Sequence, residues 1–400
     1  MRRFVLSDRD KRERDISFCT KRKMDLFISL LLAGCILAAD HVSAVGNDRG
    51  SEKINIVGED SLLGAYDPSV EYDDSGIGWL AYSAINVKLN IPFYIETHLA
   101  KSLDHGRTWT KISEANHAYD KILVINGKAV EGFCREETPT LLFDPTDPVA
   151  ARRWKLFTAV GFSKKPKKFG ELRRATSWPQ VYIAYRYAAT PEALSSAQEI
   201  PLFGSKYCKL PVCSAKHDLN DFSADLKNVV FYEEPGSLVH DGVIYLTLSA
   251  IIKHQGQKTI LLSSADHGET WKYIGVLTSI ADAKKLGFDS FTSSSLAEQN
   301  GRLFLLVSPI RQRWLLPHLE YGGIYIFEFE DISKGLLKKG AGGNLLVHKY
   351  VPPLSTRSVG GGQSEYNEQN TYGGIIMAQS DIKESSERFK IFNTGQDIAE

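Results

Sequence analysis

The sequence predicts an all-β fold, a five-bladed β-propeller, because strand-like segments of one pattern recur along the chain. Three segments begin with a turn that contains Asp or Asn and Gly, and then continue as a strand that ends in Ser: 74–83, 241–249 and 300–308. Asn-Gly and Asp-Gly supply the positive φ angles of tight hairpins, and the aromatic and β-branched residues that follow are typical of buried strands. Few segments have helical periodicity, and only 280–286 predicts a short helix.

A second repeat is an octet with the pattern Ser-x-Asp-x-Gly-x-Thr-Trp, found at 102–109 and again at 264–271. An Asp in such a turn accepts hydrogen bonds from backbone N–H groups, and Gly adopts backbone angles that residues with a side chain rarely reach. The Trp packs between neighbouring sheets. The octet resembles the Asp box of sialidase-like propellers, which lies on the periphery of the fold. This resemblance implies a structural role, away from catalysis, for Asp104, Gly106, Trp109, Asp266, Gly268 and Trp271.

Anchored on these repeats, the chain divides into five blades. They are expected at about 66–112, from 135 to about 187, 229–277, 290–329 and 362–392. About 70 residues per blade is generous for four strands with loops, so five blades fit better than six. A six-bladed, sialidase-type propeller is the alternative, because 161–228 is long enough to contain another blade. The propeller is placed at 60–395, after a lead-in at 45–59 whose first part, 45–53, is expected to be disordered.

The N-terminal residues 1–44 have the layout of a charged segment followed by a secretory signal. A Lys-Arg-Lys triplet at 21–23 precedes an apolar run at 26–39, and small residues end the segment at Ala44. The sequence therefore predicts export to the periplasm or beyond. Leu32-Ala33-Gly34-Cys35 also resembles a bacterial lipobox, and the alternative is a lipoprotein anchored through Cys35.

Charge and cysteine content exclude several classes of function. The chain has 48 basic and 48 acidic residues, so it lacks the basic excess of a nucleic-acid-binding protein. Cys208 and Cys213 are close enough to form a small disulfide loop in an oxidising compartment, and Cys134 is expected to be a buried free thiol. No spacing resembles a zinc site, and neither a metal nor a cofactor is expected. The oligomeric state is left open.

Carboxylates occur at the start of several expected blades, where the first strand of a propeller blade lines the central channel. Asp67 precedes a Pro in blade one, Glu136 and Glu137 follow Arg135 in blade two, and Glu233 and Glu234 precede a Pro in blade three. Blade five offers Gln363, Glu365 and Tyr366. Glycoside hydrolysis needs two convergent carboxyl groups, one protonated and one ionised.

These motifs resemble the five-bladed propeller glycosidases of the arabinanase/xylosidase and invertase clans. The resemblance implies a carbohydrate substrate, Asp67 as base or nucleophile, and Glu233 or Glu234 as general acid. It also implies that Glu136, together with Arg135, adjusts the pKa values of these carboxyl groups and positions them. The remaining expected substrate contacts are Glu137, Gln363, Glu365, Tyr366 and Arg311. The sequence departs from the family where blade two has Glu-Glu-Thr-Pro instead of Asp-Pro, and where Glu234 replaces Gly.

Two other functions compete with this hypothesis. A true sialidase would use an arginine cluster, here Arg135, Arg311, Arg313 and Arg357, and a tyrosine nucleophile, here Tyr366 beside Glu365. The Phe-Arg-Ile-Pro opening of sialidases is absent from the sequence. A non-catalytic propeller that binds glycans or a partner protein would need only the aromatic residues that stack on sugars.

Overall fold

A computed structural model of the chain describes residues 50–399 apart from 89–90, 126, 166–180, 209–213, 254, 313–318, 355–362 and 381–386. The described residues belong to one compact unit, 47–400. The expected signal with Cys35 lies outside them, as do Cys213, Arg313 and Arg357. Within the described part of the chain, no helix combines the length and the apolar character needed to cross a membrane.

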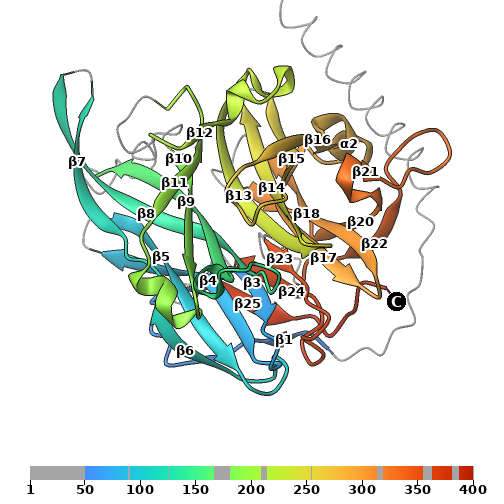
Figure 1. Cartoon of the computed structure of the whole chain (residues 1–400), viewed down its shortest axis with the longest axis horizontal. Coiled ribbons are helices and arrows are strands. Elements are labelled where there is room, and N and C mark those ends of the chain that lie inside the picture. Colours follow the sequence, from blue (N-terminus) through green and yellow to red (C-terminus); the bar gives the residue numbers. More distant parts are fainter. Residues whose placement is uncertain are drawn as a thin grey trace, which may run out of the picture. The chain divides into compact units, whose positions relative to one another are not determined.

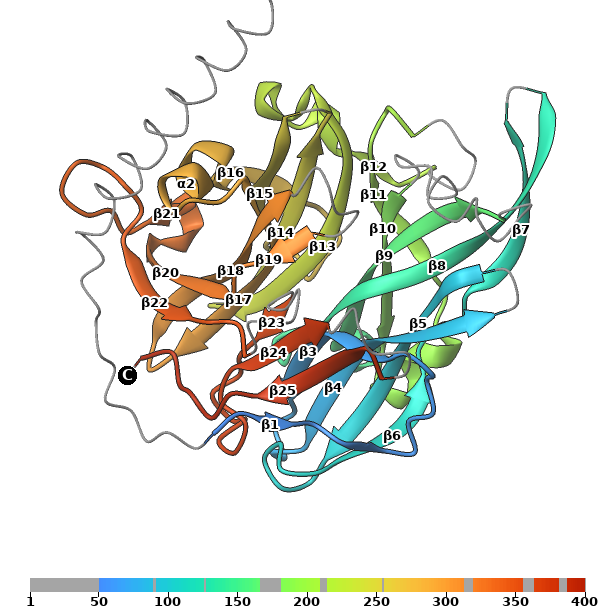
Figure 2. The same ribbon diagram turned by 180° about the vertical axis from the view of Figure 1, so that it is seen from behind.

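Five blades of β-strands follow one another along this unit and surround a common centre (Figures 1 and 2). The first and last blades join into one sheet, because β25 (Phe389–Asn393) pairs with β3 (Gly64–Tyr72). The innermost strand of each blade contacts that of the next: β3 contacts β8 (Lys128–Phe143), β8 contacts β13 (Val229–His240), β13 contacts β17 (Ser290–Gln299), β17 contacts β23 (Ser364–Glu365), and β23 contacts β3 again. A closed cycle of five inner strands is a five-bladed propeller, as the sequence predicts. The described strands of 161–228 complete blade two instead of forming a sixth blade.

The first two blades have the following strands. Blade one consists of β3 (Gly64–Tyr72), β4 (Gly78–Lys88), β5 (Ile91–Ser102) and β6 (Trp109–Glu114), with β2 (Ile56–Val57) at its outer edge. Blade two consists of β8 (Lys128–Phe143), β9 (Trp154–Lys164), β10 (Val181–Ala188) and β11 (Ile200–Gly204), flanked by β7 (Tyr119–Ile125) and β12 (His217–Asp218).

The other three blades complete the cycle. Blade three consists of β13 (Val229–His240), β14 (Val243–Ile252), β15 (Gly256–Ser264) and β16 (Lys272–Thr278). Blade four consists of β17 (Ser290–Gln299), β18 (Arg302–Gln312), β20 (Ile324–Asp331) and β22 (Val347–Val351), with β19 (Leu319–Tyr321) and β21 (Leu336–Leu337) beside them. Blade five consists of β23 (Ser364–Glu365), β24 (Ile376–Ser380) and β25 (Phe389–Asn393).

Among the described residues, helical turns occur only in the connections between strands. The predicted short helix is α2 (Ile280–Lys285), and the side chains of Ser279 and Asp282 form a capping box at its start. The 3-10 turns are η1 (Ala150–Arg152), η3 (Glu192–Ser196), η5 (Leu219–Asp221), η6 (Ala224–Leu226) and η7 (Ile332–Lys334).

The ring is closed by the N-terminal strand. β1 (Glu52–Lys53) pairs antiparallel with β25, so a segment that precedes blade one in the sequence becomes the outer strand of the last blade. The backbone N–H of Ile54 extends this pairing by donating to the carbonyl of Ile391 at 2.8 Å. The expectation of a disordered lead-in is therefore wrong at residues 52 and 53, because the free edge of β25 supplies hydrogen-bonding partners that the local sequence does not reveal.

Both octets fold into the same hydrogen-bonded turn between the third and fourth strands of their blades. In the first, Asp104 accepts hydrogen bonds from the Thr108 amide at 2.8 Å and from its hydroxyl at 2.7 Å. In the second, Asp266 accepts the matching bonds from Thr270 at 2.8 and 2.6 Å. The indole N–H of each Trp donates back to the octet's own glycine carbonyl, at 3.0 and 3.1 Å.

The octet tryptophans pack each blade against the preceding one. Trp271 of blade three makes edge-to-face contacts with Phe157 and Phe203 of blade two. Trp109 of blade one belongs to a buried cluster that includes Ile376 and Ile391 of blade five. Because the cluster spans two sheets, these residues stabilise the ring as well as their own turn.

We expect Trp271→Ala to lower the free energy of unfolding by about 3–5 kcal/mol, since it leaves a large cavity between two blades. Urea unfolding followed by fluorescence measures this loss. Leu103→Ala is the matched control, because Leu103 lies in the first octet with 75% of its surface exposed. A loss below about 1 kcal/mol for Trp271→Ala would show that the inter-blade contact contributes little.

Candidate active site

Four of the five inner strands share a bulge at the same position. The antiparallel pairing with the second strand skips residues after Tyr66, Glu137, Glu233 and Thr292. The next residue in each strand has a positive φ: Asp67 (49°), Thr138 (51°), Glu234 (55°) and Ser293 (49°). Positive φ is uncommon for residues other than glycine, and bulges are frequent beside active sites. Three of these four residues precede Pro, whose missing N–H is tolerated in a bulge.

A cavity of about 1450 Å³ opens over these bulges. Its acidic lining at the bulges consists of Asp67, Glu137, Glu233 and Glu234, with Arg135 beside them. Aliphatic and aromatic side chains form most of the remaining wall, among them Ile85, Ile251, Phe231 and Tyr66. Carboxylates from blades one, two and three therefore meet in one apolar cavity, although they are far apart in the sequence.

Asp67 is held in an environment that favours the protonated acid. It is 8% exposed, and it accepts a hydrogen bond from the Ser83 hydroxyl at 2.8 Å. Burial and the neighbouring charges of Glu137 and Glu234 raise the pKa of Asp67 to about 8. At neutral pH this carboxyl group therefore retains its proton.

Glu234, at the equivalent bulge of blade three, has the opposite surroundings. Its Oε2 accepts hydrogen bonds from the Ser249 hydroxyl at 2.8 Å, from the Ser293 amide at 2.7 Å and from the Thr292 hydroxyl. Its Oε1 accepts a hydrogen bond from the Ser293 hydroxyl at 2.9 Å. Four donors match a carboxylate anion, which has only acceptors. The negative charge of Glu234 in turn helps to raise the pKa of its acidic neighbours.

The other two acids in the cavity have different partners. The pKa of Glu233 is raised well above its usual value by burial and by the charges of Glu234 and Glu137. Its Oε1 accepts a hydrogen bond from the Gln257 amide at 3.0 Å. Glu137 forms an ion pair with Arg135, with Oε1 2.9 Å from Nη2. Burial raises the pKa of Glu137, and Arg135 opposes this shift.

The serines that end two of the three strand repeats have a role at this site that the sequence pattern did not reveal. Ser83 lies opposite Tyr66 in the register of blade one, and Ser249 lies opposite Glu233 in blade three. Both serines donate to the bulge carboxylate of their own blade. Ser83 also accepts the backbone N–H of Thr138 at 3.0 Å, which ties the bulges of blades one and two together.

Tyr321, at the end of β19, also lines the cavity and was missed in the sequence. Burial, with Tyr66 and Glu234 nearby, raises the pKa of Tyr321 well above its usual value, so the phenol keeps its proton. The two glycines that follow allow this placement. A Cβ on Gly322 would lie 2.2 Å from the Phe288 ring, and Gly323 has a φ of +85°. A Tyr-Gly-Gly triplet is the only local signal of this geometry.

Several residues expected at the site lie elsewhere. Glu136 alternates with Glu137 along β8, so its carboxylate does not line the cavity but pairs with Arg186 at 3.2 Å. Arg135 therefore has Glu137 as its partner, not Glu136. Arg311 also does not line the cavity: its Nε donates to the Gly287 carbonyl, and its guanidinium lies over the Phe288 ring. Gln363 is fully buried, and its amide donates to the Pro139 carbonyl at 3.4 Å.

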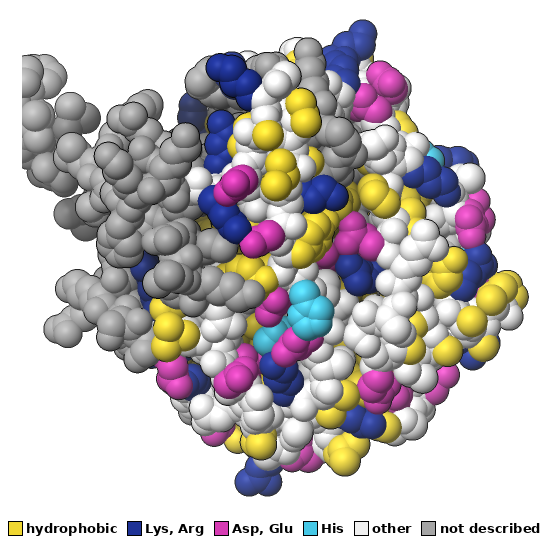
Figure 3. Space-filling view, turned by 90° about the vertical axis from the view of Figure 1, so that its left-hand side faces the viewer, with side chains coloured by type: hydrophobic (Ala, Val, Ile, Leu, Met, Phe, Trp, Pro, Cys, Tyr) yellow, Lys and Arg dark blue, Asp and Glu magenta, His cyan; other side chains and the backbone are white. Residues whose placement is uncertain are grey.

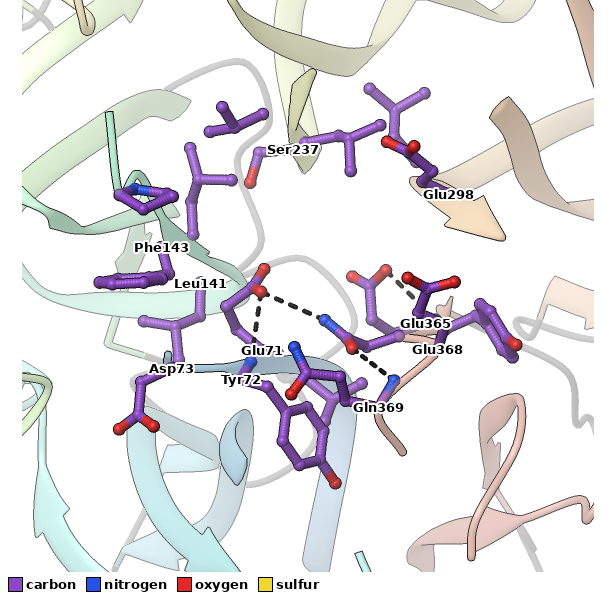
Figure 4. Close-up of a pocket in the computed structure, with 18 of the residues that line it drawn as sticks. Glu71, Tyr72, Asp73, Leu141, Phe143, Ser237, Glu298, Glu365, Glu368 and Gln369 are labelled. Carbon is purple, nitrogen blue, oxygen red and sulfur yellow. Dashed lines mark hydrogen bonds between the residues drawn. The ribbon is translucent and has the colours of Figure 1, made fainter. Parts of the chain in front are cut away.

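Glu365 and Tyr366 line a second cavity, of about 360 Å³, along the later halves of the inner strands (Figure 4). Figure 4 shows Glu365 on the opposite side of this cavity from Asp73, with Glu71 between them. Burial raises the pKa of Glu71 to about 8, and burial together with Glu71 raises that of Glu365. The Tyr366 hydroxyl donates to Asp397 instead of facing Glu365 as a sialidase pair would.

The cysteines agree with the sequence expectations as far as they are described. Cys134 is a buried free thiol. Cys208 is disulfide-bonded, and its expected partner, Cys213, lies outside the described residues.

Comparisons with known proteins give only distant likenesses. No protein-family model matches the sequence, and no curated protein matches it. Among solved structures, the chain is similar to a Hadza microbial sialidase (13% identity, TM-score 0.45, 82% of this chain and 55% of that one). It is also similar to a xylan beta-1,4-xylosidase from Bacillus halodurans (15% identity, TM-score 0.43, 75% of this chain and 48% of that one). A third similar structure is an alpha-L-arabinanase from Penicillium chrysogenum (11% identity, TM-score 0.46, 86% of this chain and 97% of that one). The chain spans about half the length of the first two.

We expect Asp67→Asn to stabilise the fold increasingly as the pH rises. In the folded state the pKa of Asp67 is about 8, above its unfolded value near 4, so its contribution to stability is lost as the pH rises toward 8. Asn keeps the neutral form, and the gain should reach at least about 1 kcal/mol at pH 8 and be smaller at pH 5. Thermal unfolding at both pH values measures it.

Asp74→Asn is the control for this experiment, because Asp74 is exposed in the turn after the same strand. A stability gain at Asp67 that did not change between pH 5 and pH 8 would contradict the raised pKa.

Proposed function

We propose that this chain is an exported glycoside hydrolase whose reaction takes place in the cavity over the bulges. One observation carries the proposal: two carboxyl groups at equivalent bulges of blades one and three line the same cavity in opposite environments. Asp67 keeps its proton, and Glu234 accepts four hydrogen bonds. A protonated acid and a carboxylate that share one site are the minimum machinery for cleaving a glycosidic bond. Export rests on the signal-like residues 21–44.

On the basis of these environments, we assign the two catalytic roles in the reverse of the order that the family resemblance suggested. Asp67 donates its proton to the glycosidic oxygen as the bond to the anomeric carbon breaks. Glu234 acts from the other side of the sugar, either as the nucleophile or as the base that deprotonates a water molecule. The hydrogen bonds from Ser249 and Ser293 keep Glu234 in one orientation. This preorganisation avoids a reorientation of the carboxylate during the reaction.

The remaining polar residues of the cavity tune this pair or bind hydroxyl groups. The charge of Glu137 helps to keep Asp67 protonated, and Arg135 limits that effect by pairing with Glu137. Glu233, Gln257 and Tyr321 offer donors and acceptors to a sugar, and Tyr66 and Phe231 offer aromatic surface. Arg135 is the one arginine among the described residues that line the cavity, and it is paired with the carboxylate of Glu137. A sialidase would need a cluster of arginines to bind the carboxylate of its substrate, so this lining does not favour that function.

Leaving-group dependence tests the roles of Asp67 and Glu234. Asp67→Asn should lower kcat/KM for 4-methoxyphenyl glycosides by about 10²–10⁴-fold, and much less for 2,4-dinitrophenyl glycosides, which need no proton. Glu234→Gln should abolish turnover of both, and azide should restore activity with the activated substrate. A panel of arabinosides, xylosides and sialosides supplies the aryl glycosides.

Glu298→Gln is the control, because Glu298 lies at the second cavity and pairs with His240. A protein that binds sugars but hydrolyses none of the panel is a lectin, and this result would overturn the proposal. If Asp67→Asn lost the same fraction of activity with every leaving group, Asp67 would not be the general acid.

The pH profile gives an independent check. Because the acid must be protonated, kcat/KM of the wild-type protein should fall as the pH rises through about 8, the pKa of Asp67. In Asp67→Asn, this alkaline limb should disappear from the residual activity with 4-methoxyphenyl glycosides, whose leaving group needs the proton. An alkaline limb that is unchanged in the variant would assign it to another group.

A further inference from the structure

A second cluster of acids and histidines lies on the outer strands of blade one, away from the cavity over the bulges. Glu96 and His98 are two residues apart on β5 and therefore face the same side of the sheet. Glu114 ends β6 directly opposite His98 in the strand register. One ligand atom from each of these three side chains lies within 4.8 Å of the other two. On the side of the unit where β5 and β7 lie, Figure 3 shows histidine side chains bordered by acidic ones.

His98 has an unmet bonding requirement at this cluster. The side chain is 2% exposed, and its Nδ1 lies 2.8 Å from Oε2 of Glu59. Its Nε2 is buried and makes no hydrogen bond with any residue that the structure describes. The nearest carboxylate oxygens belong to Glu96, at 3.8 Å, and Glu114, at 3.9 Å, which is beyond hydrogen-bonding range.

Neither protonation state of His98 resolves this geometry. If Nδ1–H donates to Glu59 and the ring is neutral, the lone pair of Nε2 faces two carboxylates. If the ring is charged, Nε2–H lies at ion-pair distance from Glu96 and Glu114, but it still has no acceptor within hydrogen-bonding range. A cation bound to Nε2 and to both carboxylates satisfies all three groups, and Glu59 then orients the ring as carboxylates commonly do for metal-binding histidines.

The turn after β6 brings a second imidazole to the same place. Nδ1 of His117 lies 3.1 Å from Oε2 of Glu114 and 3.7 Å from Oε1 of Glu96. Asn116 fixes the turn by accepting the Thr97 amide at 2.8 Å, and Glu96 accepts the Ala118 amide at 3.1 Å. His117 is 65% exposed, so it can adjust toward a bound ion at little cost.

A similar cluster, formed by residues of blades two and three, already contains a positively charged side chain. Asp144, Asp147 and His267 also bring three potential ligands within 4.8 Å. There the fully buried ammonium of Lys155 lies 2.9 Å from Asp147 and 3.5 Å from Asp144, so a side-chain cation already neutralises the acids. In the blade-one cluster, Nζ of Lys111 lies 3.1 Å from Oε1 of Glu114, and among the described residues it forms no ion pair with Glu96.

We propose that Glu96, His98, Glu114 and His117 bind one divalent transition-metal ion, for which Zn²⁺ is the probe. Two imidazoles with two carboxylates suit Zn²⁺, whose bonds to nitrogen and oxygen are about 2.0–2.2 Å long in four-coordinate sites. They do not suit Mg²⁺ or Ca²⁺, which prefer oxygen ligands alone. The ion would clamp β5, β6 and the turn at 114–118 together, and Glu59 would position His98. It would take no part in catalysis.

The test is Zn²⁺ titration of the full chain, with any purification tag removed and bound metal first stripped by a chelator. Competition against a chromophoric chelator should show one site with a Kd of about 1 μM or tighter. Glu114→Gln and His117→Ala should each weaken binding about tenfold or more, and Glu59→Gln about 10–100-fold. Saturating Zn²⁺ should raise Tm by about 2–5 °C in the wild type and less in these variants.

His240→Ala is the matched control, because His240 also contacts two carboxylates, those of Glu298 at 3.0 Å and Asp241 at 3.4 Å, but belongs to no three-ligand group among the described residues. It should leave Zn²⁺ affinity unchanged. The proposal is overturned if Zn²⁺ does not bind below about 100 μM, or if Glu114→Gln and His117→Ala bind it as the wild type does. Equal affinity for Ca²⁺ and Zn²⁺ would also overturn it, since the imidazoles would then not be ligands.

Discussion

The candidate active site depends on one backbone constraint, the left-handed residue in the bulge that four of the five inner strands share. A regular strand would alternate its side chains between the two faces of the blade, and only every second residue could point toward the cavity. The bulge breaks that alternation, so the consecutive residues Glu233 and Glu234 both line the cavity. Positive φ angles at residues such as Asp67 and Glu234 cost free energy. The hydrogen bonds of neighbouring blades offset that cost.

These hydrogen bonds make the site a property of the ring and not of a single blade. The amide of Ser293 in blade four orients Glu234 of blade three, and Ser83 of blade one accepts the amide of Thr138 in blade two. A bulge carboxylate is therefore held in place by the bulge of its neighbour. The octet tryptophans pack the same blades together at the periphery, and the strand pairing of β1 with β25 closes the ring. Stability at the periphery and order at the centre are consequently linked.

The buried acids of the molecule differ in the hydrogen-bond donors and charged groups that surround them. Asp67 and Glu233 have few donors in an apolar cavity, and their pKa values rise. Glu234 has four donors. Beside the outer strands of blade one, Glu59, Glu96 and Glu114 surround the buried His98, where the unmet bonding of Nε2 favours a cation. The same residue type therefore holds a proton, a negative charge or, as we propose, a metal ion, according to its neighbours.

The sequence alone determined the all-β class, the number of blades, the two octet turns and the positions of the inner strands, because these features follow from local periodicity and turn chemistry. It also placed Asp67, Glu137, Glu233, Glu234 and Arg135 at the centre. It did not distinguish Glu136 from Glu137, because strand register decides which of two adjacent side chains faces inward. Only the tertiary structure brought Tyr321, Ser83 and Ser249 to the acids, moved Glu365 to the second cavity, and assembled His98 with Glu59 and Glu114. Those contacts join residues from different strands and blades, and their chemistry depends on burial, which the order of residues along a chain does not specify.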